Sequence, residues 1–257
     1  MGKDILIIGA TFTGIGAGYA AKERTLIVEP RQQVGYEFIN SFNPGTGYGT
    51  MQLSPVADGI KTEMKSRGIL VDDGRVHVPA LAPMMFNRIQ TDNIPVLLQA
   101  FVAESRPVAG GFETDIYTAA GYETIKSKFV LDTRPGKKVI SKRINAMLCS
   151  AGGEFSASCG GVEYMGGALA GEVIMKLPVE INDDFSVARR KLHAFWEQRS
   201  DNLKPWTIAA VADCFEFAAL KDVSTLCPGH FQISSCAFAN PLEAFDAGYR
   251  FISGGAL

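Results

Sequence analysis

The sequence is poor in the features that mark several common classes of protein. Its 257 residues include only 3 histidines, and the formal net charge at pH 7 is -2. No apolar run approaches the ~20 residues of a membrane-spanning helix. A nearly neutral chain also has no excess of basic residues with which to bind nucleic acid or an acidic membrane surface. We therefore expect neither a nucleic-acid partner nor a membrane partner.

Cysteine is also scarce, and the five cysteines contain neither a CxxC pair nor the spacing of a metal site. We expect reduced, buried thiols and no bound metal, and the missing CxxC argues against a disulfide reductase. The chain starts directly on an apolar strand pattern without the segments of a signal peptide, which predicts a cytoplasmic protein. The cysteines are Cys149, Cys159, Cys214, Cys227 and Cys236.

What the sequence does contain is a strand, a glycine-rich turn and a helix at its start, DILIIGATFTGIGAGYA. Residues 5–8 are a continuous apolar run, which is typical of a central parallel strand. Gly9 can turn the chain tightly, and Gly14, Gly16 and Gly18 fall in the helix that follows. The start of this helix presents free N–H groups and a partial positive charge, which suit a pyrophosphate.

The second strand, residues 25–28, is followed by Glu29. An acidic side chain at that place can accept hydrogen bonds from both hydroxyls of a ribose and repels a 2′-phosphate. The order of strand, glycine turn, helix, strand and acid therefore indicates dinucleotide binding. The pattern departs from GxGxxG, because Thr11 replaces the middle glycine and the span from Gly14 to Glu29 is about one helical turn short. The alternative is an ordinary strand–helix–strand start with no ligand.

A second interpretation is an NAD-dependent short-chain dehydrogenase, whose loop reads GxxxGxG. The segment GATFTGIGAG is similar to it, although its glycines are too far apart. That family also needs a Tyr-x-x-x-Lys pair on a helix, and Tyr122 and Lys126 have this spacing. Their surroundings alternate like a strand, however, and in a strand residues four apart are separated by about 13 Å. We therefore rank this interpretation second.

The middle of the chain predicts a β-meander. Between residues 94 and 133, short alternating runs are separated by glycine-containing turns. Residues 112–118 alternate apolar and polar side chains, and residues 122–128 return toward the sheet. A final apolar strand ends at Asp132, within the motif VLDTRP. A short-chain dehydrogenase has no such insert.

The C-terminal segment ANPLEAFDAGYRF predicts a capped helix. Asn240 is a good N-cap, and Pro241 is favoured in the first helical turn. Leu242, Phe245 and Tyr249 form an apolar stripe at helical spacing. The N–H groups at the start of this helix would stabilise negative charge on a neighbouring ligand. The alternative is a capped terminal helix without a ligand.

With these segments at its two ends and the meander between them, the sequence resembles the glutathione-reductase-like FAD-dependent oxidoreductases. The resemblance implies that the first strand–helix–strand unit binds the ADP half of FAD and that the C-terminal helix points at the flavin. It also implies backbone contacts from Phe101 and Val102 to the adenine, and places Arg31 near the AMP part. The usual motif after the meander is closer to Asp-x-Thr-Gly-Asp, so Arg134 and Pro135 depart from it. The cofactor-binding residues expected from the resemblance are Gly9, Thr11, Phe12, Thr13, Gly14, Glu29, Pro30, Arg31, Phe101, Val102, Asp132, Asn240 and Pro241.

The expected fold is α/β: a Rossmann-like FAD-binding parallel sheet with a β-meander crossover and a small second, substrate-side sheet region. We assign residues 1–135 and 227–257 to the FAD-binding domain, with residues 36–90 partly wrapping the cofactor or facing substrate. Residues 136–226 form the small substrate or interaction region. Its compactness suggests a small substrate, or a site that a homo-oligomer or partner subunit completes.

The expected function is an FAD-dependent oxidoreductase that transfers a hydride between a small molecule and the flavin. His230, in CPGHFQISSC just before the C-terminal helix, is the candidate for proton transfer, against the plainer interpretation of a loop histidine. No second GxGxxG is present, so we expect no separate NAD(P)H domain. Two alternatives remain: the short-chain dehydrogenase, and an FAD-binding subunit of a larger complex with weak or no redox activity of its own.

Overall fold

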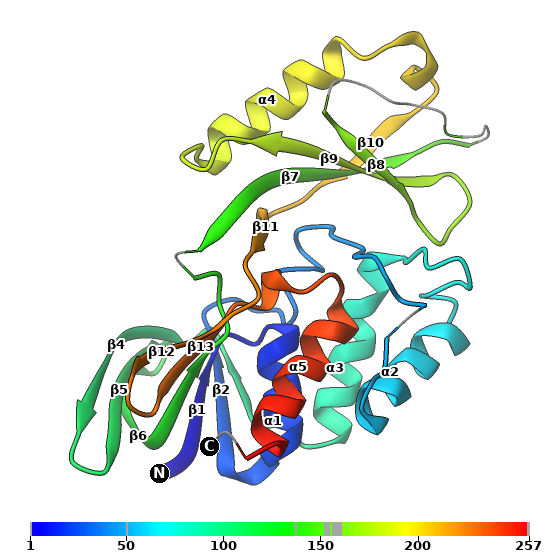
Figure 1. The fold of residues 1–257 in the computed structure, drawn as a ribbon. Coiled ribbons are helices and arrows are strands. Elements are labelled where there is room, and N and C mark those ends of the chain that lie inside the picture. Colours follow the sequence, from blue (N-terminus) through cyan, green and yellow to red (C-terminus); the bar gives the residue numbers. More distant parts are fainter. Residues whose placement is uncertain (1, 50, 137, 152–154, 156–160, 256–257) are drawn as a thin grey trace.

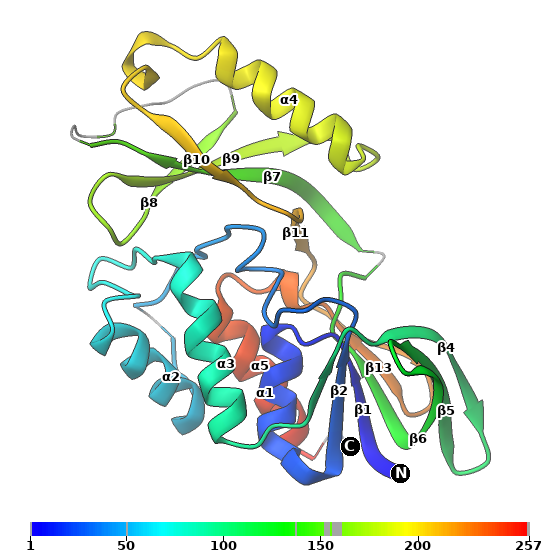
Figure 2. The same cartoon turned by 180° about the vertical axis from the view of Figure 1, so that it is seen from behind.

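The computed structural model describes the whole chain except residues 1, 50, 137, 152–154, 156–160 and 256–257. Its two β-sheets lie one above the other, and each is covered by helices of its own (Figure 1, Figure 2). The larger, lower sheet is built from both ends of the sequence. The smaller, upper sheet is built from a single stretch in the second half of the chain.

The larger sheet has eight strands, and its main path follows the order β12-β13-β6-β1-β2-β3. From β13 to β3 all neighbours on this path pair in parallel, as the continuous apolar run of β1 predicts. The carboxyl ends of these strands therefore meet at one edge of the sheet, where open α/β sheets bind ligands. The bounds are β1 Gly2–Ile8, β2 Thr25–Glu29, β3 Val96–Leu98, β6 Gly121–Asp132, β12 Val223–Cys227 and β13 His230–Ile233.

The predicted meander is confirmed. β4 Phe101–Val108 pairs antiparallel with β5 Gly111–Thr118, and β5 pairs antiparallel with the first half of β6. The second half of β6 then enters the main sheet beside β1. The meander covers one face of the sheet with apolar side chains, among them Phe112 and Ile116.

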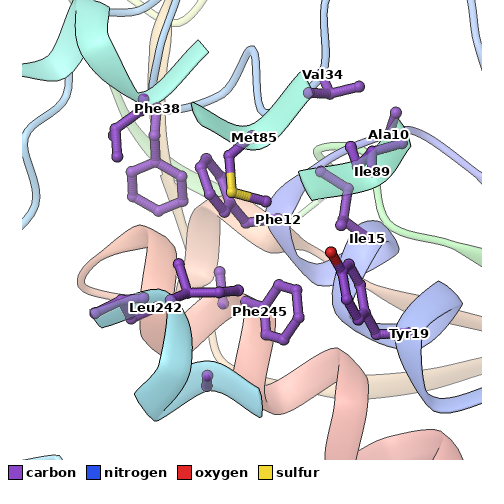
Figure 3. Close-up of a cluster of buried hydrophobic side chains, with 14 of the residues drawn as sticks. Ala10, Phe12, Ile15, Tyr19, Val34, Phe38, Met85, Ile89, Leu242 and Phe245 are labelled. Atoms are coloured by element: carbon purple, nitrogen blue, oxygen red, sulfur yellow. The ribbon is translucent and has the colours of Figure 1, made fainter. Parts of the chain in front are cut away.

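Helices cover the opposite face of the larger sheet (Figure 2). Figure 3 shows the core that they form, with Phe12 of α1 beside Phe38 and Met85, and Tyr19 beside Phe245 of α5. The bounds are α1 Phe12–Ala21, α2 Pro55–Ser66, α3 Leu81–Thr91 and α5 Pro241–Ser253, with the short 3₁₀ helices η1 Lys22–Arg24, η2 Val78–Ala80 and η4 Ser235–Ala237.

The glycines of α1 serve close packing on two sides. A Cβ on Gly18 would lie 2.7 Å from Cδ1 of Ile27 in β2. A Cβ on Gly16 would lie 1.9 Å from the carbonyl oxygen of Phe245, and one on Gly248 would lie 1.9 Å from that of Thr13. Small residues therefore bring α1 against both the sheet and α5.

The smaller sheet is antiparallel, with the order β10-β7-β9-β8 and with β11 also paired to β7. One of its faces packs against α4 Phe185–Glu197, which Asp184 caps, through buried side chains such as Ala188 and Leu192. The bounds are β7 Val139–Cys149, β8 Glu163–Gly166, β9 Glu172–Val179, β10 Thr207–Val211 and β11 Glu216–Ala219, with η3 Asp201–Leu203 before β10. The expected fold class, a parallel sheet with a meander and a second small sheet, is thus confirmed, whereas the residue limits of the two domains stay a prediction.

Candidate functional site

The carboxyl end of β1 is the centre of the candidate site. Gly9 follows β1 with a φ of 101°, a left-handed conformation that glycine adopts without strain. Its N–H donates to the carbonyl oxygen of Val28 over 2.8 Å. A Cβ on Gly14 would lie 2.1 Å from the carbonyl oxygen of Gly9. The two glycines therefore allow α1 to start directly against the end of β1.

The free N–H groups at the start of α1 are occupied by side chains. Thr11 is the N-cap, and its Oγ1 accepts from the third N–H of the helix at 3.0 Å. The N–H of Phe12 donates to Oε1 of Glu37 over 2.7 Å, and that of Thr13 donates to Oγ of Ser235 over 3.2 Å. All three donors of the first turn therefore have acceptors from the protein itself.

Thr11 stands where a dinucleotide loop has its middle glycine, and its side chain is fully buried. Its hydroxyl donates to Oγ1 of Thr133 over 2.7 Å, and that hydroxyl in turn contacts the carbonyl oxygen of Gly9 at 3.0 Å. The middle glycine of the usual loop leaves this space to a pyrophosphate. Here Thr11 carries a side chain at that position and ties the loop after β1 to the end of β6.

Glu29 lies at the end of β2, as the sequence indicates, and is fully buried. Its Oε2 accepts from the N–H of Ala10, and its Oε1 from that of Arg31, each at 3.0 Å. Burial raises the pKa of the Glu29 carboxyl, and the two backbone N–H groups oppose that rise. The carboxylate thus joins the loops after β1 and β2, while its contact with a ribose stays a prediction.

Glu37 is an acidic residue of the site that the sequence did not single out. It is 4% exposed. Its Oε1 accepts from the N–H of Phe12 and from the hydroxyl of Ser235, each at 2.7 Å, whereas its Oε2 has no partner among the described residues. Burial raises the pKa of Glu37 to about 7 against these hydrogen bonds. The only signal in the sequence is a lone acid within the glycine- and aromatic-rich segment after Glu29.

Asp132, at the end of β6, is paired with Arg134. Its carboxylate accepts from the backbone N–H of Arg134 at 3.0 Å and from the guanidinium at 2.6 and 3.0 Å. These hydrogen bonds raise the pKa of Arg134. The arginine that departs from the family motif thus engages Asp132, whose contact with a cofactor stays a prediction.

Asn240 and Pro241 start α5, as predicted. Oδ1 of Asn240 accepts from the N–H of Glu243 at 2.9 Å, and its Nδ2 donates to the carbonyl oxygen of Thr46 over 2.7 Å. The glycine-rich segment lies directly on this cap, because a Cβ on Gly45 would be 2.6 Å from Cα of Asn240. That the cap faces a flavin stays a prediction.

The residues assigned to the adenine end lie around the end of β2. Pro30 and Arg31 form the bend after the strand, and the guanidinium of Arg31 lies 3.8 Å from the ring centre of Tyr36. The carbonyl of Arg31 accepts a hydrogen bond from the segment that leads into β4. At the start of β4, Phe101 is 55% exposed and Val102 packs on the core of the meander. Their contact with adenine stays a prediction.

His230 lies on the face of the larger sheet that the meander covers. It begins β13, where it pairs with Val130 of β6, and its ring packs edge-on against Phe112 of the meander. Burial lowers the pKa of His230, and the nearby charge of Asp132 opposes this. The ring is therefore on the face that the meander covers, whereas α1 and α5 cover the other. The proton-transfer role of His230 stays a prediction that this placement does not favour.

Tyr122 and Lys126, the pair that a short-chain dehydrogenase would need, both lie on β6. Tyr122 is 77% exposed, and Lys126 points to a surface ion pair with Glu113 at 3.1 Å. Since that family needs the pair on a helix, this alternative is wrong.

The described cysteines are free thiols, but the expectation that they are buried is wrong for most of them. Only Cys236 is buried, whereas Cys149, Cys214 and Cys227 are half-buried, and Cys159 lies outside the described residues. The described part of the chain holds no group of three or more histidine, cysteine or acidic residues placed for a metal. Within that same part, every helix is too short or too polar to cross a membrane.

A buried ion pair that the sequence did not reveal joins the smaller sheet to the segment after Glu37. Lys176 of β9 contacts Glu216 of β11 at 3.0 Å and donates to Oδ1 of Asn43 over 2.8 Å. Asn145 of β7 donates to the same carboxylate over 2.6 Å and to the carbonyl oxygen of Ser41 over 2.7 Å. The smaller sheet therefore holds residues 41–43 in place.

His77 belongs to the same boundary between the two sheets. Its Nδ1 lies 2.7 Å from Oε2 of Glu172, the first residue of β9. The other carboxylate oxygen of Glu172 is buried without a partner among the described residues. His77 thus links η2 to the smaller sheet.

The donor set at the start of α1 fits a diphosphate, but the space in front of it is taken. The three N–H groups at the N-terminus of α1 donate to oxygens of Glu37, Ser235 and Thr11. A helix N-terminus of this kind favours an anion. Ala10, Thr11, Thr13 and Glu29 are each 0% exposed. A cofactor phosphate would therefore reach the N–H of Phe12 only after Glu37 has moved, and that of Thr13 only after Ser235 has moved.

The two-sheet arrangement is shared with solved proteins. A geranylgeranyl bacteriochlorophyll reductase-like protein from Thermoplasma acidophilum matches 97% of this chain and 76% of its own, with a TM-score of 0.63 and 11% identity. Glycine oxidase from Geobacillus kaustophilus matches 95% and 92%, with a TM-score of 0.64 and 12% identity. A flavoprotein/dehydrogenase from Cytophaga hutchinsonii matches 99% and 79%, with a TM-score of 0.59 and 12% identity. No protein-family model matches the sequence, and neither does any curated protein.

These likenesses extend over both sheets, and identities this low show the fold alone. The chain therefore has a fold that occurs in flavoproteins and oxidoreductases. The narrower likeness to the glutathione-reductase-like group rests on the sequence pattern and stays a prediction.

Proposed function

We propose that the chain is an FAD-dependent oxidoreductase that acts on a small molecule. The proposal is carried by two neighbouring groups at the carboxyl ends of the strands: N–H donors at the start of α1, after β1, and the carboxylate of Glu29 at the end of β2. The start of α1 has three N–H groups that now donate to Glu37, Ser235 and Thr11, and Glu29 stands at the end of the neighbouring strand. This is the arrangement that a diphosphate and an adjacent ribose require.

In this proposal each residue acts through binding and orientation. The N–H groups of Phe12 and Thr13 hold the diphosphate, and Glu29 holds the ribose. The start of α5 at Asn240 faces the flavin, and the smaller sheet bounds the space for substrate. Bound FAD would supply two-electron redox chemistry at its ring system. The protein works in the cytoplasm, without nucleic acid or membrane, and a second copy or partner subunit completes the substrate site.

Two further observations support the proposal, and neither depends on the segment between β1 and α1. The likeness to flavoproteins and oxidoreductases covers at least 95% of this chain in the three proteins named above. The sequence also has its acid, meander and capped terminal helix in the order expected of this class.

A second candidate is a protein of the same fold that has lost its redox cofactor, alone or as a subunit of a complex. It is favoured by the burial of every donor at the start of α1. The test is the visible absorption spectrum of the purified protein, followed by titration of the cofactor-stripped protein with FAD. Stoichiometric binding of one FAD per chain supports the first candidate. A colourless protein that binds no FAD at saturating concentration overturns it and leaves the second.

A further inference from the structure

The carboxylate of Glu37 lies at the start of α1, and neither the fold nor a bound cofactor requires it there. Glu37 lies 25 residues beyond Phe12 in the chain, yet its Oε1 accepts the first free N–H of the helix over 2.7 Å. The hydroxyl of Ser235, on η4, donates to the same oxygen over 2.7 Å. Three separate segments of the chain thus converge on one carboxylate oxygen.

The second oxygen of this carboxylate is left without a partner, so the side chain is only partly satisfied where it lies. Oε2 of Glu37 is buried and has no hydrogen-bond partner within the described part of the chain. A buried polar atom without a partner costs stability, and native proteins keep few of them. The charge of the group that suits this place follows from α1, a helix of ten residues. The N–H groups and the partial positive charge at its N-terminus favour an anion.

We infer that Glu37 is the internal ligand of an anion site at the start of α1, and that a diphosphate binds there only by displacing its carboxylate. The inference rests on the proposed function for the identity of the diphosphate, which is that of FAD. It adds that the carboxylate of Glu37 competes with the diphosphate of the cofactor for the N–H of Phe12. A carboxylate and a diphosphate cannot share the N–H of Phe12, and two anions at one helix start repel each other.

The segment that carries Glu37 is held at both of its ends. Gly35 is fixed by its N–H, which donates to the carbonyl oxygen of Ala10 over 2.7 Å. Ser41 and Asn43 are fixed by Asn145 and Lys176 of the smaller sheet. Glu37 lies between these anchors, so the inference requires its side chain to move while both anchors hold.

The first experiment uses inorganic pyrophosphate as the probe and thermal unfolding as the readout. In Glu37→Ala the N–H of Phe12 loses its acceptor, so pyrophosphate should raise the unfolding temperature of the variant and leave that of the parent chain unchanged. Glu197→Gln, which removes one exposed acid of α4, is the control and should behave like the parent. An equal response of all three chains, or none in Glu37→Ala, overturns the inference.

The second experiment measures FAD affinity by fluorescence quenching of cofactor-stripped protein. Glu37→Gln keeps an acceptor oxygen but no charge, so it covers the case in which Glu37→Ala does not fold. It should bind FAD about tenfold or more tightly than the parent. Equal affinity overturns the inference while the proposed function stands. A pyrophosphate response in Glu37→Ala without FAD binding by any chain keeps the anion site and overturns the proposed function.

Discussion

Gly16 of α1 and Phe245 of α5 touch through their backbones: a Cβ on Gly16 would lie 1.9 Å from the carbonyl oxygen of Phe245. Since a main-chain atom cannot move aside alone, Gly16→Ala should push the two helices apart and lower the free energy of unfolding by about 1–3 kcal/mol. Gly59, in α2, has open space around the same position, so Gly59→Ala should raise it by about 0.5–1 kcal/mol. Urea unfolding of both variants measures the two changes in the free energy of unfolding. Equal changes would contradict the close contact described for Gly16.

Local patterns in the sequence predicted the elements that make up the fold. The apolar run before Gly9, the cap at Asn240 with Pro241, and the alternation of residues 112–118 each act over a few neighbours. The structure has a strand, a helix start and a meander strand at those places. The fold class could therefore be predicted from short-range signals taken in order.

The contacts that close the site could not be predicted this way. Glu37 meets Ser235 across 198 residues of sequence, and Lys176 meets Glu216 across 40. Neither contact leaves a periodic pattern, because each depends on how separate elements pack. The same holds for His230, which the sequence placed near a flavin and the structure places against the meander.

The ion pair of Lys176 and Glu216 gives a second prediction. Their side chains are 4% and 8% exposed, so Lys176→Met leaves a carboxylate buried with fewer partners. This should lower the free energy of unfolding by about 1–3 kcal/mol, since Glu216 keeps its contacts with Arg143 and Asn145. Lys191→Met breaks a more exposed pair with Asp183 and should lower the free energy of unfolding far less. Chemical unfolding of both variants tests the contrast, and similar losses would show that Lys176 is not held as described.

The third prediction is a pH dependence of stability that comes from Glu37. Burial raises its pKa from the ordinary 4.5 to about 7, and the neighbouring charge of Glu29 on β2 adds to the rise, against hydrogen bonds from Ser235 on η4 and Phe12 on α1. The folded chain therefore binds a proton more tightly than the unfolded chain. The stability that this proton contributes is present at low pH and is lost as the pH rises from about 4.5 to about 7.

Glu37→Gln lacks this proton, so its stability relative to the parent should increase between pH 5 and pH 8. The lowered pKa of His230 acts in the opposite direction, but it is common to both chains and cancels in the difference. Urea unfolding of both proteins at the two pH values gives the result. A difference that does not change with pH would mean that Glu37 titrates as it does in water.

The last prediction separates the two roles of Glu29. Glu29→Ala removes the acceptor of two backbone N–H groups, those of Ala10 and Arg31, and should lower the free energy of unfolding without cofactor by about 1–3 kcal/mol. If the carboxylate also binds a ribose, FAD retention should weaken by about 1–3 kcal/mol as well. Glu29→Gln keeps one acceptor oxygen and should show smaller losses of both kinds.

Glu104→Ala, on the exposed edge of β4, is the control and should change neither quantity. Because the unfolding measurement is made without FAD, the two losses are independent. A Glu29→Ala chain that is less stable but retains FAD as well as the parent under dilution would leave Glu29 as a residue that joins two loops and would remove it from the cofactor site.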